Sequence, residues 1–207
     1  MKEYKLSKQC KGTRILVGNS NRVLLNKIID ILIAEKFSEI RLPTIEPSSI
    51  YIDKSGKEIE NQMYVFKDKA DRDLCLRPEC TATIQEFAKE HKPILCNKKL
   101  FYIQKCYRYE SPQKGRYREF YQLGVEILYP TKDYTDYLIE LGERIVSLVT
   151  SDYEINNDVI RGLDYYTEKG FEISTNSLGT QNQLLGGGKY ETGIGFAIGL
   201  DRLYLLI

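Results

Sequence analysis

The chain has 207 residues, and its 30 basic and 29 acidic side chains leave a formal net charge of +1. This length allows one large domain or two small ones around a hydrophobic core. The balanced charge provides no molecule-wide field of the kind that attracts nucleic acid, and no apolar run approaches the length of a membrane span.

The cysteine and histidine content excludes several kinds of site. The 5 cysteines form no C-x-x-C pair and His91 is the only histidine, so we expect neither a zinc centre nor a Cys/His nucleophile. The odd number of cysteines and the lack of a signal-peptide pattern favour a reducing compartment. We therefore expect a soluble, cytoplasmic protein without a membrane partner.

The first sixty residues predict one helix and one short strand. Residues 1–18 are polar and basic, which is typical of an irregular segment or a short strand. Asn19 or Ser20 can cap a helix over 20–37, where apolar residues recur at helical spacing. Residues 40–43 predict a strand ended by proline at a sheet edge or interface, and 46–62 predict a loop.

The next segments predict two short strands and a helix. The strands cover 63–66 and 73–76 and are joined by a charged turn. The helix covers 80–91, and Pro78 is well placed at its start.

A long antiparallel hairpin is predicted over 101–129. Two stretches rich in aromatic and β-branched residues flank a charged loop that contains Ser111 and Gly115. Strand alternation places polar residues together on one face. These are Gln104, Cys106 and Arg108 on the first strand and Phe120, Gln122, Gly124 and Glu126 on the second. Such a face is suited to a polar ligand, and the alternative is a solvated hairpin with scattered charges.

The remaining segments complete an α+β pattern. We expect an amphipathic helix over 133–150 and short β segments near 159–166 and 171–175. A glycine cluster at 186–188 precedes an apolar segment that predicts a final helix over 196–207. Without repeats or linkers, residues 1–207 are expected to form a single α+β domain with a mostly antiparallel sheet.

Basic residues gather around the hairpin: Lys98, Lys99, Lys105, Arg108, Lys114, Arg116 and Arg118. Such a cluster fits an anionic ligand, for example a nucleotide or an acceptor stem. The alternative is a solvated basic loop.

Five motifs in family order resemble the catalytic domain of histidyl-tRNA synthetase, a class II aminoacyl-tRNA synthetase. They are RLPTIE at 41–46, LRPECTA at 76–82, YRYESPQKGRYREFYQLGVEIL at 107–128, RGLDYYTEKGFE at 161–172, and GGGKY with GFAIGLDRL at 186–203. The resemblance implies a six- or seven-stranded antiparallel sheet flanked by helices and a homodimer formed through the segment around Pro43. It also implies a reaction in which histidine and ATP give histidyl-adenylate and pyrophosphate, followed by transfer of histidine to tRNA.

The resemblance assigns an ATP site to residues of several motifs. Arg108 is expected to contact the α-phosphate and Arg116 the β- and γ-phosphates. Arg161 is expected to approach the phosphates from the opposite side. Phe120 and Arg202 are expected to enclose adenine, with Glu110 accepting from its amino group. Magnesium is expected to bridge the phosphates, and the sequence names no ligands for it. The alternatives are a structural ion pair for Arg161 and a core position for Phe120.

A histidine site is also implied by the resemblance. Glu79, Thr81 and Gln122 resemble residues that bind the ammonium group, and Glu126, Tyr166 and Tyr190 resemble those that read the imidazole ring. A carboxylate that faces a ring N–H rejects analogues lacking this donor, because they would leave the carboxylate unpaired. The alternative for Glu126 is a buried pair with an arginine. The glycines at 186–188 are expected to form a tight turn near the amino acid.

Several departures from the family pattern bear on this assignment. Cys80 stands where the family has glycine, Ser111 replaces a usual arginine, and Glu191 replaces an aspartate. Cys80 is expected to shift or crowd the ammonium-binding loop, and Ser111 removes a phosphate contact. Between Tyr129 and Arg161 there is room for a helix and a strand but not for the family's insertion domain, and no anticodon-binding domain follows. We therefore expect a minimal form of the enzyme, with a separate tRNA-binding partner as one solution for tRNA recognition.

Two other functions stay open. One is a non-catalytic histidine sensor resembling the regulatory subunit of ATP phosphoribosyltransferase. The other is an enzyme that adenylates histidine for an acceptor other than tRNA. Sensors of this type tend to lose the ATP-binding arginines, whereas Arg108, Arg116, Arg161 and Arg202 are all present here.

Overall fold

The computed structural model describes residues 19–52, 54–111, 113–160 and 162–207. A seven-stranded sheet forms its centre, in the order β1-β5-β6-β10-β9-β8-β7. Only the short β1 runs parallel to its neighbour, and every other described pair is antiparallel. The strand bounds are β1 Ser38–Glu39, β5 Lys98–Tyr107, β6 Glu119–Leu128, β7 Glu154–Val159, β8 Gly170–Ser174, β9 Gln183–Tyr190 and β10 Gly193–Gly199. The expected α+β class with a mainly antiparallel sheet is confirmed.

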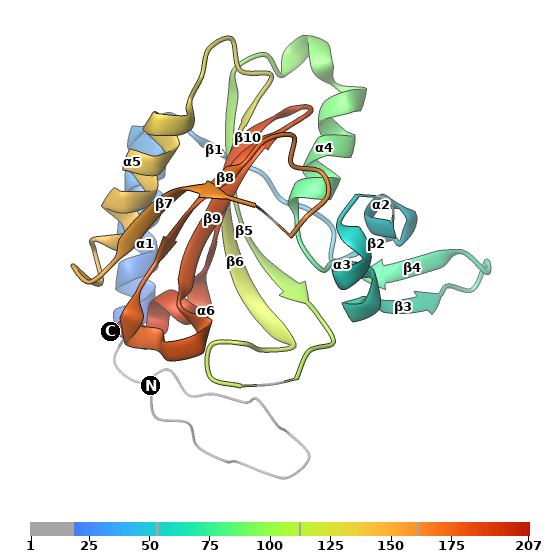
Figure 1. Cartoon of the computed structure of the whole chain (residues 1–207). Helices are drawn as coiled ribbons and strands as arrows, with labels where there is room; N and C mark the ends of the chain where they lie inside the picture. Colours follow the sequence, from blue (N-terminus) through green and yellow to red (C-terminus); the bar gives the residue numbers. More distant parts are fainter. Residues whose placement is uncertain (1–18, 53, 112, 161) are drawn as a thin grey trace.

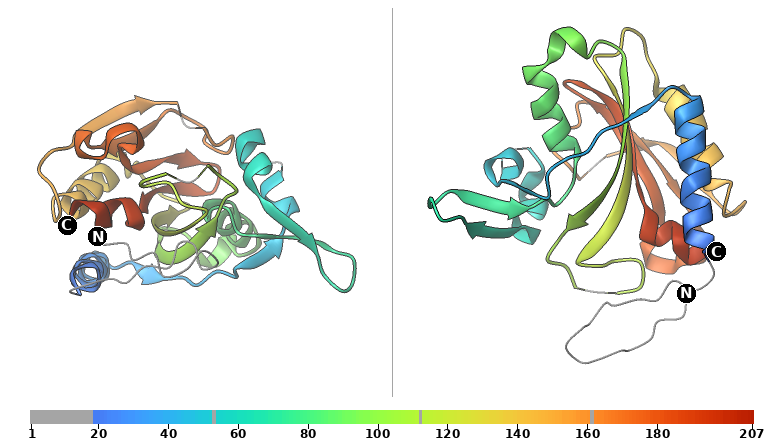
Figure 2. Two further views of the ribbon diagram at one scale, coloured as in Figure 1. Left: turned by 90° about the horizontal axis from the view of Figure 1, so that it is seen from below. Right: turned by 180° about the vertical axis from the view of Figure 1, so that it is seen from behind.

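Helices cover both faces of this sheet (Figures 1 and 2). Helices α1 (Ser20–Ala34) and α5 (Thr135–Val146) lie side by side on one face, and α4 (Thr81–Glu90) lies on the other. The three helices fall within or close to the stretches in which apolar residues recur at helical spacing. Asn19 precedes α1 at the cap position, but its side chain makes no capping hydrogen bond.

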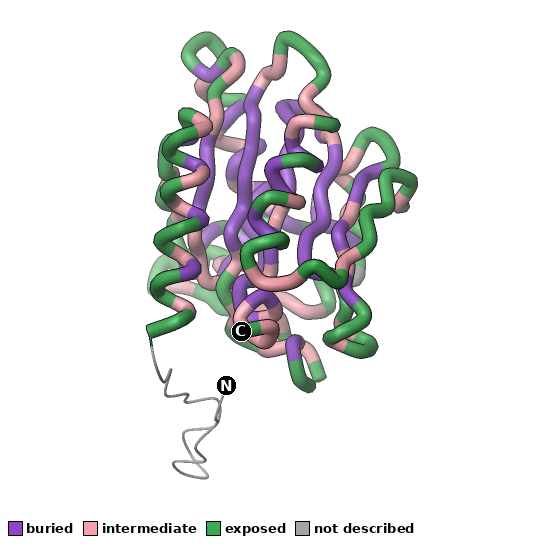
Figure 3. Tube along the Cα trace, turned by 90° about the vertical axis from the view of Figure 1, so that its left-hand side faces the viewer, coloured by how far each residue is buried: buried purple, intermediate pink, exposed green. Residues whose placement is uncertain are grey.

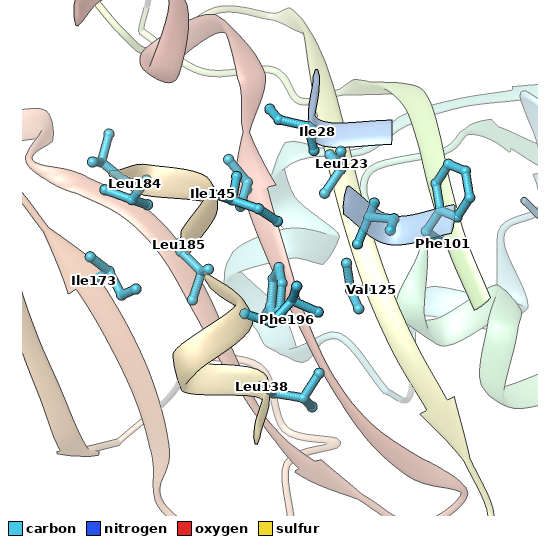
Figure 4. Packing of buried hydrophobic residues seen from close by; sticks show 14 of the residues in the cluster. Ile28, Phe101, Leu123, Val125, Leu138, Ile145, Ile173, Leu184, Leu185 and Phe196 are labelled. Carbon is cyan, nitrogen blue, oxygen red and sulfur yellow. The ribbon is translucent and has the colours of Figure 1, made fainter. Parts of the chain in front are cut away.

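The larger core fills the space between the sheet and helices α1 and α5. Ile28 of α1 and Leu138 and Ile145 of α5 pack with Val125 and Phe196 from the sheet (Figure 4). The central strands are buried over most of their length, whereas the outer sides of the helices are exposed (Figure 3). The other face of the sheet combines a smaller apolar cluster, which includes Ile84 of α4, with the polar residues described below.

The predicted hairpin is formed by β5 and β6, and its register brings the expected polar residues together. Gln104 pairs with Gln122, Cys106 with Phe120, and Leu100 with Glu126. Since residues directly opposite one another in a sheet share a face, the polar side chains lie together on the face that α4 only partly covers.

A second sheet of three short strands, in the order β2-β4-β3, projects from the body of the molecule (Figures 1 and 2). Its strands are β2 Ile45–Pro47, β3 Tyr64–Lys67 and β4 Asp73–Leu76, and the last two match the predicted pair. The prediction for 40–43 is wrong, because the strand in this region is β1. The loop predicted over 46–62 is also wrong, because it contains the end of β2 and helices α2 (Ser49–Ile52) and α3 (Gly56–Gln62).

The C-terminal segments differ most from the sequence predictions. The β segment expected near 159–166 is β7 at 154–159, and the glycines at 186–188 lie inside β9 rather than in a turn. A side chain at Gly187 would clash, because its Cβ would lie 2.4 Å from the Gly195 oxygen and 2.6 Å from Phe171. The glycines therefore allow close packing within the sheet.

The final apolar stretch begins as a strand. Phe196 and Ile198 lie in β10 and pair with β6, so the helix predicted over 196–207 is wrong in its first part. Helix α6 covers only Leu200–Leu203, and the 3-10 helix η3 (Tyr204–Leu206) follows. Two other 3-10 helices are η1 (Lys92–Ile94) and η2 (Asn176–Gln181).

The segment 1–18 lies outside the described residues, and the single domain over 1–207 stays a prediction. Among the described residues, no helix is long and apolar enough to cross a membrane.

Candidate active site

A cavity of about 310 Å³ opens on the polar face of the sheet. It lies between the start of β6, the start of β9, the end of β10, the start of α4 and the segment 162–166. Most of the predicted site residues line it: Glu79, Thr81, Arg108, Glu110, Arg116, Phe120, Gln122, Tyr166 and Arg202. These residues are far apart in the sequence, and the fold brings them to one place.

The other predicted residues lie elsewhere. Glu126 and Tyr190 are buried: Glu126 accepts a hydrogen bond from the lining residue Thr81, and Tyr190 donates one to Glu126. Arg161 lies outside the described residues, although Gly162 and Leu163 after it line the cavity.

One end of the cavity is strongly basic. The Arg108 guanidinium lies over the Phe120 ring, with 5.4 Å to its centroid, and its Nε donates to the Pro78 oxygen at 2.9 Å. Arg116 forms an ion pair with Glu110 across the loop. Arg202 is the third arginine that lines this end of the cavity. Three guanidinium groups gathered here, one of them paired with Glu110, make this end attractive for phosphate groups.

Arg202 is fixed by the chain around it. Its Nε donates to the Gly115 oxygen at 2.8 Å and its Nη1 to the Gln183 oxygen at 2.9 Å. Burial lowers the pKa of the Arg202 guanidinium, Glu110 opposes this effect, and the charges of Arg108 and Arg116 lower it further. These cations repel one another in the empty cavity, and a bound anion would relieve this repulsion.

The other end has one buried carboxyl group in its lining, Glu79, and a second, Glu126, that lies behind the lining residue Thr81. Glu79 accepts hydrogen bonds from the backbone nitrogens of Thr81 at 2.6 Å and Ala82 at 3.0 Å, and from the Ser55 hydroxyl at 3.2 Å. Burial raises the pKa of Glu79, and these hydrogen bonds oppose the shift. The contacts to the first turn of α4 fix the carboxyl group at the cavity wall.

Glu126 is the second buried carboxyl group, with 1% of its surface exposed. Thr81 donates to its Oε1 at 3.1 Å, and the Tyr190 hydroxyl donates to its Oε2 at 2.7 Å. Burial raises the pKa of Glu126 to about 8, while the two hydroxyl groups oppose the shift and Glu79 adds to it. This end of the cavity therefore favours a ligand that carries positive charge or shares a proton.

A buried arginine supports the segment that carries Glu79. Arg77 donates to the backbone oxygens of Leu42 at 3.0 Å and Lys105 at 2.9 Å, and to Gln104 Oε1 at 3.1 Å. Its backbone oxygen accepts from the Tyr107 nitrogen at 2.9 Å. These contacts anchor the end of β4 on β5, which places Glu79 directly above the hairpin.

The positions that depart from the family pattern lie outside the cavity lining. Cys80 is buried with its Sγ 3.9 Å from Cys106 Sγ, so its side chain packs on β5 and does not enter the cavity lining between Glu79 and Thr81. Ser111 is exposed. Glu191 is paired with Lys89 at 2.8 Å on the surface.

The sequence did not single out several polar residues that line the cavity: Tyr117, Tyr121, Tyr165, Gln183 and Asp201. Tyr165 packs against Tyr166 with ring centroids 4.7 Å apart, and burial raises its pKa. In the motifs, Tyr165 directly precedes the predicted residue Tyr166, and Asp201 directly precedes Arg202. This adjacency is the signal by which the sequence could have indicated them.

No cluster of three or more His, Cys, Asp or Glu side chains suited to a metal ion occurs within the part of the chain that the structure describes. The carboxylates nearest the basic end are those of Glu110 and Asp201, which both line the cavity. Two carboxylates fit a magnesium ion that takes most of its ligands from phosphates and water.

Comparisons with known proteins identify the family. The family profile described as histidyl-tRNA synthetase matches residues 19–132. The histidine–tRNA ligase of Methanococcus aeolicus is 38% identical over 151 residues, covering 70% of this chain and 36% of that protein. The chain therefore spans about a third of the length of such relatives.

Longer alignments extend the similarity. The histidine–tRNA ligase of Archaeoglobus fulgidus is 30% identical and aligns with 83% of this chain and 68% of its own length. The chloroplastic histidine–tRNA ligase of Gracilaria tenuistipitata var. liui is 27% identical, with 100% of this chain covered in an alignment of 317 residues. Since this chain has 207 residues, that relative contains residues without counterparts here.

Solved structures agree with the sequence comparisons. The apo histidyl-tRNA synthetase of S. aureus superposes with a TM-score of 0.73 at 26% identity, covering 94% of this chain and 68% of that chain. A pyrrolysyl-tRNA synthetase from Desulfitobacterium hafniense has a TM-score of 0.72 at 18% identity, covering 90% of this chain and 66% of that one, which supports the fold alone. The chain therefore belongs to the histidyl-tRNA synthetase family and has the fold of a class II synthetase catalytic domain.

Proposed function

We propose that the chain binds histidine and ATP in this cavity, joins them into histidyl-adenylate with release of pyrophosphate, and transfers histidine to tRNA. The observation that carries the proposal is a cavity with three arginines at one end and the carboxyl group of Glu79 at the other, behind which the buried Glu126 accepts a hydrogen bond from Thr81. A triphosphate fits the first end, and a ligand with an ammonium group and an imidazole fits the second.

The first step needs positioning rather than a side-chain base. A carboxylate oxygen of histidine attacks the α-phosphorus of ATP, and the bond from this phosphorus to the leaving pyrophosphate breaks. Arg108 is proposed to hold the α-phosphate, and Arg116 the β- and γ-phosphates after leaving Glu110. Arg161 is proposed on the opposite side. Fixed guanidinium groups stabilise the charge that develops on the phosphate oxygens.

ATP is proposed to lie with its adenine between the Phe120 ring and the Arg202 guanidinium, and with its amino group near Glu110. The positions of Phe120 and Arg202 in the lining support this arrangement. The proposed magnesium ion would neutralise phosphate charge, with Glu110 and Asp201 as the nearest carboxylates of this chain.

The histidine pocket is proposed to use Glu79, Thr81 and Gln122 for the ammonium group. Glu126 and Tyr166 face the imidazole ring in this proposal, with Tyr190 holding Glu126. With a pKa of about 8, Glu126 keeps its proton at neutral pH in the free protein. It can donate that proton in a hydrogen bond to a ring nitrogen of histidine, which an apolar side chain cannot accept.

The alternative functions differ in what they require of the basic end. A histidine sensor needs only the carboxyl end of the cavity, whereas Arg108, Arg116 and Arg202 all line the other end, which favours catalysis. The homodimer, the cytoplasmic location, the single domain and a separate tRNA-binding partner belong to the proposal as well.

The test uses a stable analogue of the proposed intermediate, histidyl-sulfamoyl-adenosine. We expect this analogue to raise the melting temperature more than histidine and ATP together, because ligands that bind only the folded state stabilise it. The phenylalanyl analogue is the matched control. Equal stabilisation by both analogues would contradict the histidine assignment. Charging of tRNA with labelled histidine tests the transfer step, and adenylate formation without charging would indicate a different acceptor.

A further inference from the structure

Asp201 is a buried carboxylate that lines the cavity, and its side chain also contacts the backbone of β6. It lies in the short helix α6, directly before Arg202, and 7% of its surface is exposed. Its Oδ2 accepts a hydrogen bond from the backbone nitrogen of Tyr121 at 2.6 Å. Hydrogen bonds to an ionised acceptor are shorter and stronger than neutral ones, so this contact is a firm link between α6 and β6.

The contact forms where β6 extends beyond its neighbour β10. Strand β10 pairs with β6 only as far as Gly199, which lies opposite Gln122. Pairing between β5 and β6 continues to Glu119, so the first residues of β6 have a strand on one side only. The Asp201 carboxylate takes the place of the missing backbone acceptor for Tyr121, whose N–H would otherwise lack a partner in a half-buried position.

The residues on either side of this contact are those proposed to bind ATP. Phe120 precedes Tyr121, and Arg202 follows Asp201. Arg202 also donates to the oxygens of Gly115 and Gln183. Asp201 thus holds the start of β6, and the next residue, Arg202, holds the loop before β6.

Gln122 differs from Phe120 in how it is held. Gln122 pairs with Gln104 on one side and Gly199 on the other, whereas Phe120 pairs only with Cys106. Loss of the Asp201 contact would therefore loosen Phe120 more than Gln122, which is proposed to bind the histidine ammonium group.

We propose that Asp201 is a positioning residue for the ATP half of the cavity, where its carboxylate fixes the start of β6 and so keeps Phe120 facing Arg202. This inference rests on the proposed function. It assigns Asp201 a role in ATP affinity that is separable from histidine affinity.

The test compares two substitutions in ATP–pyrophosphate exchange. Asp201→Ala removes the acceptor, and we expect it to raise the KM for ATP about tenfold, equivalent to about 1.4 kcal/mol. The KM values for histidine and pyrophosphate should stay unchanged. Asp201→Asn keeps an acceptor oxygen without the charge, so it should recover most of the loss. The matched control is Asp68→Asn, because Asp68 accepts from the backbone nitrogens of Ala70 and Arg72 in an exposed turn, and it should change none of these constants.

An unchanged KM for ATP in Asp201→Ala, or equal increases for ATP and histidine, would overturn the inference. If Asp201→Ala does not fold, Asp201→Asn provides the test. We then expect a smaller rise in the KM for ATP and no change in the KM for histidine. Absence of exchange in the wild-type chain would instead contradict the proposed function. ATP affinity measured by calorimetry would then decide the role of Asp201.

Discussion

Glu126 is a carboxyl group whose burial has a consequence for stability as well as for ligand choice. Its pKa of about 8 in the folded chain lies above the value of 4.5 for an exposed glutamate. Between these two values the folded state binds more protons than the unfolded state. The contribution of Glu126 to stability is therefore complete at acidic pH and is lost as pH rises toward 8.

Glu126→Gln should remove this pH dependence, because the amide has a similar shape and does not ionise. We expect the variant and the wild type to have similar free energies of unfolding near pH 4. The variant should then gain relative stability as pH rises to 8, by at most about 1.4 kcal/mol per pH unit. Urea unfolding at a series of pH values measures this difference, and a constant difference across the range would contradict the assigned pKa shift.

The same substitution should affect histidine more than ATP. The amide can donate a neutral hydrogen bond, but it cannot ionise to form the stronger charge-assisted pair with the imidazole ring, so we expect Glu126→Gln to raise the KM for histidine about tenfold or more. The KM for ATP should change little because Glu126 lies at the other end of the cavity. Equal losses for the two substrates would argue against its role in reading the ring.

Arg108 provides the matching test at the basic end. We expect Arg108→Ala to lower the rate of adenylate formation by at least about a hundredfold. Circular dichroism and the melting temperature should show that the fold is intact, since the side chain makes few structural contacts besides the Pro78 oxygen and the Phe120 ring. Arg118→Ala is the control, because Arg118 is exposed outside the cavity lining. Substantial exchange in Arg108→Ala would exclude Arg108 from the phosphate site.

At the scale of elements, the hairpin β5–β6 depends on one glycine. A Cβ at Gly124 would lie 2.0 Å from the Tyr102 ring, which packs across the hairpin and donates to Gln122 at 3.2 Å. The glycine therefore makes room for the tyrosine that supports the floor of the cavity.

Gly124→Ala should destabilise the chain by about 2 kcal/mol or more, because the ring or the strand must move to admit the methyl group. Urea unfolding measures this loss. Gly162→Ala is the matched control, since nothing lies within 4 Å of a Cβ built there, and it should have little effect on the free energy of unfolding. Similar values for the two variants would contradict the packing argument.

Elements with a long periodic pattern could be predicted from the sequence, and short ones could not. Helices α1, α4 and α5 and the hairpin follow from residue periodicity. Helices α2 and α3 do not, because they are too short for periodicity and depend on distant contacts. The Tyr51 hydroxyl donates to Glu46 at 2.5 Å and Ser55 donates to Glu79. A short apolar run such as 196–203 fits a strand or a helix equally well, and only pairing with β6 decides it.

The candidate site was predictable only because several motifs coincided. Each motif alone has an ordinary structural explanation, and spacing along the chain does not reveal that Glu79 and Arg202 line the same cavity. Tyr165 was missed because alternation along a strand would place only one of two adjacent tyrosines at the ligand. The segment 162–166 is irregular, so both tyrosines line the cavity.

At the scale of the whole molecule, the small sheet β2-β4-β3 exposes an apolar face. Ile45, Leu76 and Tyr64 lie opposite one another on neighbouring strands and share this face. Two of its side chains are clearly exposed: Ile45 by 52% and Phe66 by 38%. Pro43 is exposed just before it. The expected homodimer through this segment would bury that apolar surface.

Ile45→Glu should therefore shift the chain from dimer to monomer in sedimentation velocity, because a charge at the centre of an apolar contact is costly to bury. Ile94→Glu is the control, since Ile94 is 74% exposed in η1, and it should not alter the oligomeric state. A wild-type chain that is monomeric at micromolar concentration would contradict the dimer prediction.

The central claim is that this cavity activates histidine with ATP. Its most direct test is histidine-dependent ATP–pyrophosphate exchange by the purified chain, without tRNA and with the other nineteen amino acids as controls. We predict exchange with histidine alone. Histidine binding without exchange for any amino acid would contradict the claim, and would identify the cavity as the site of a histidine sensor.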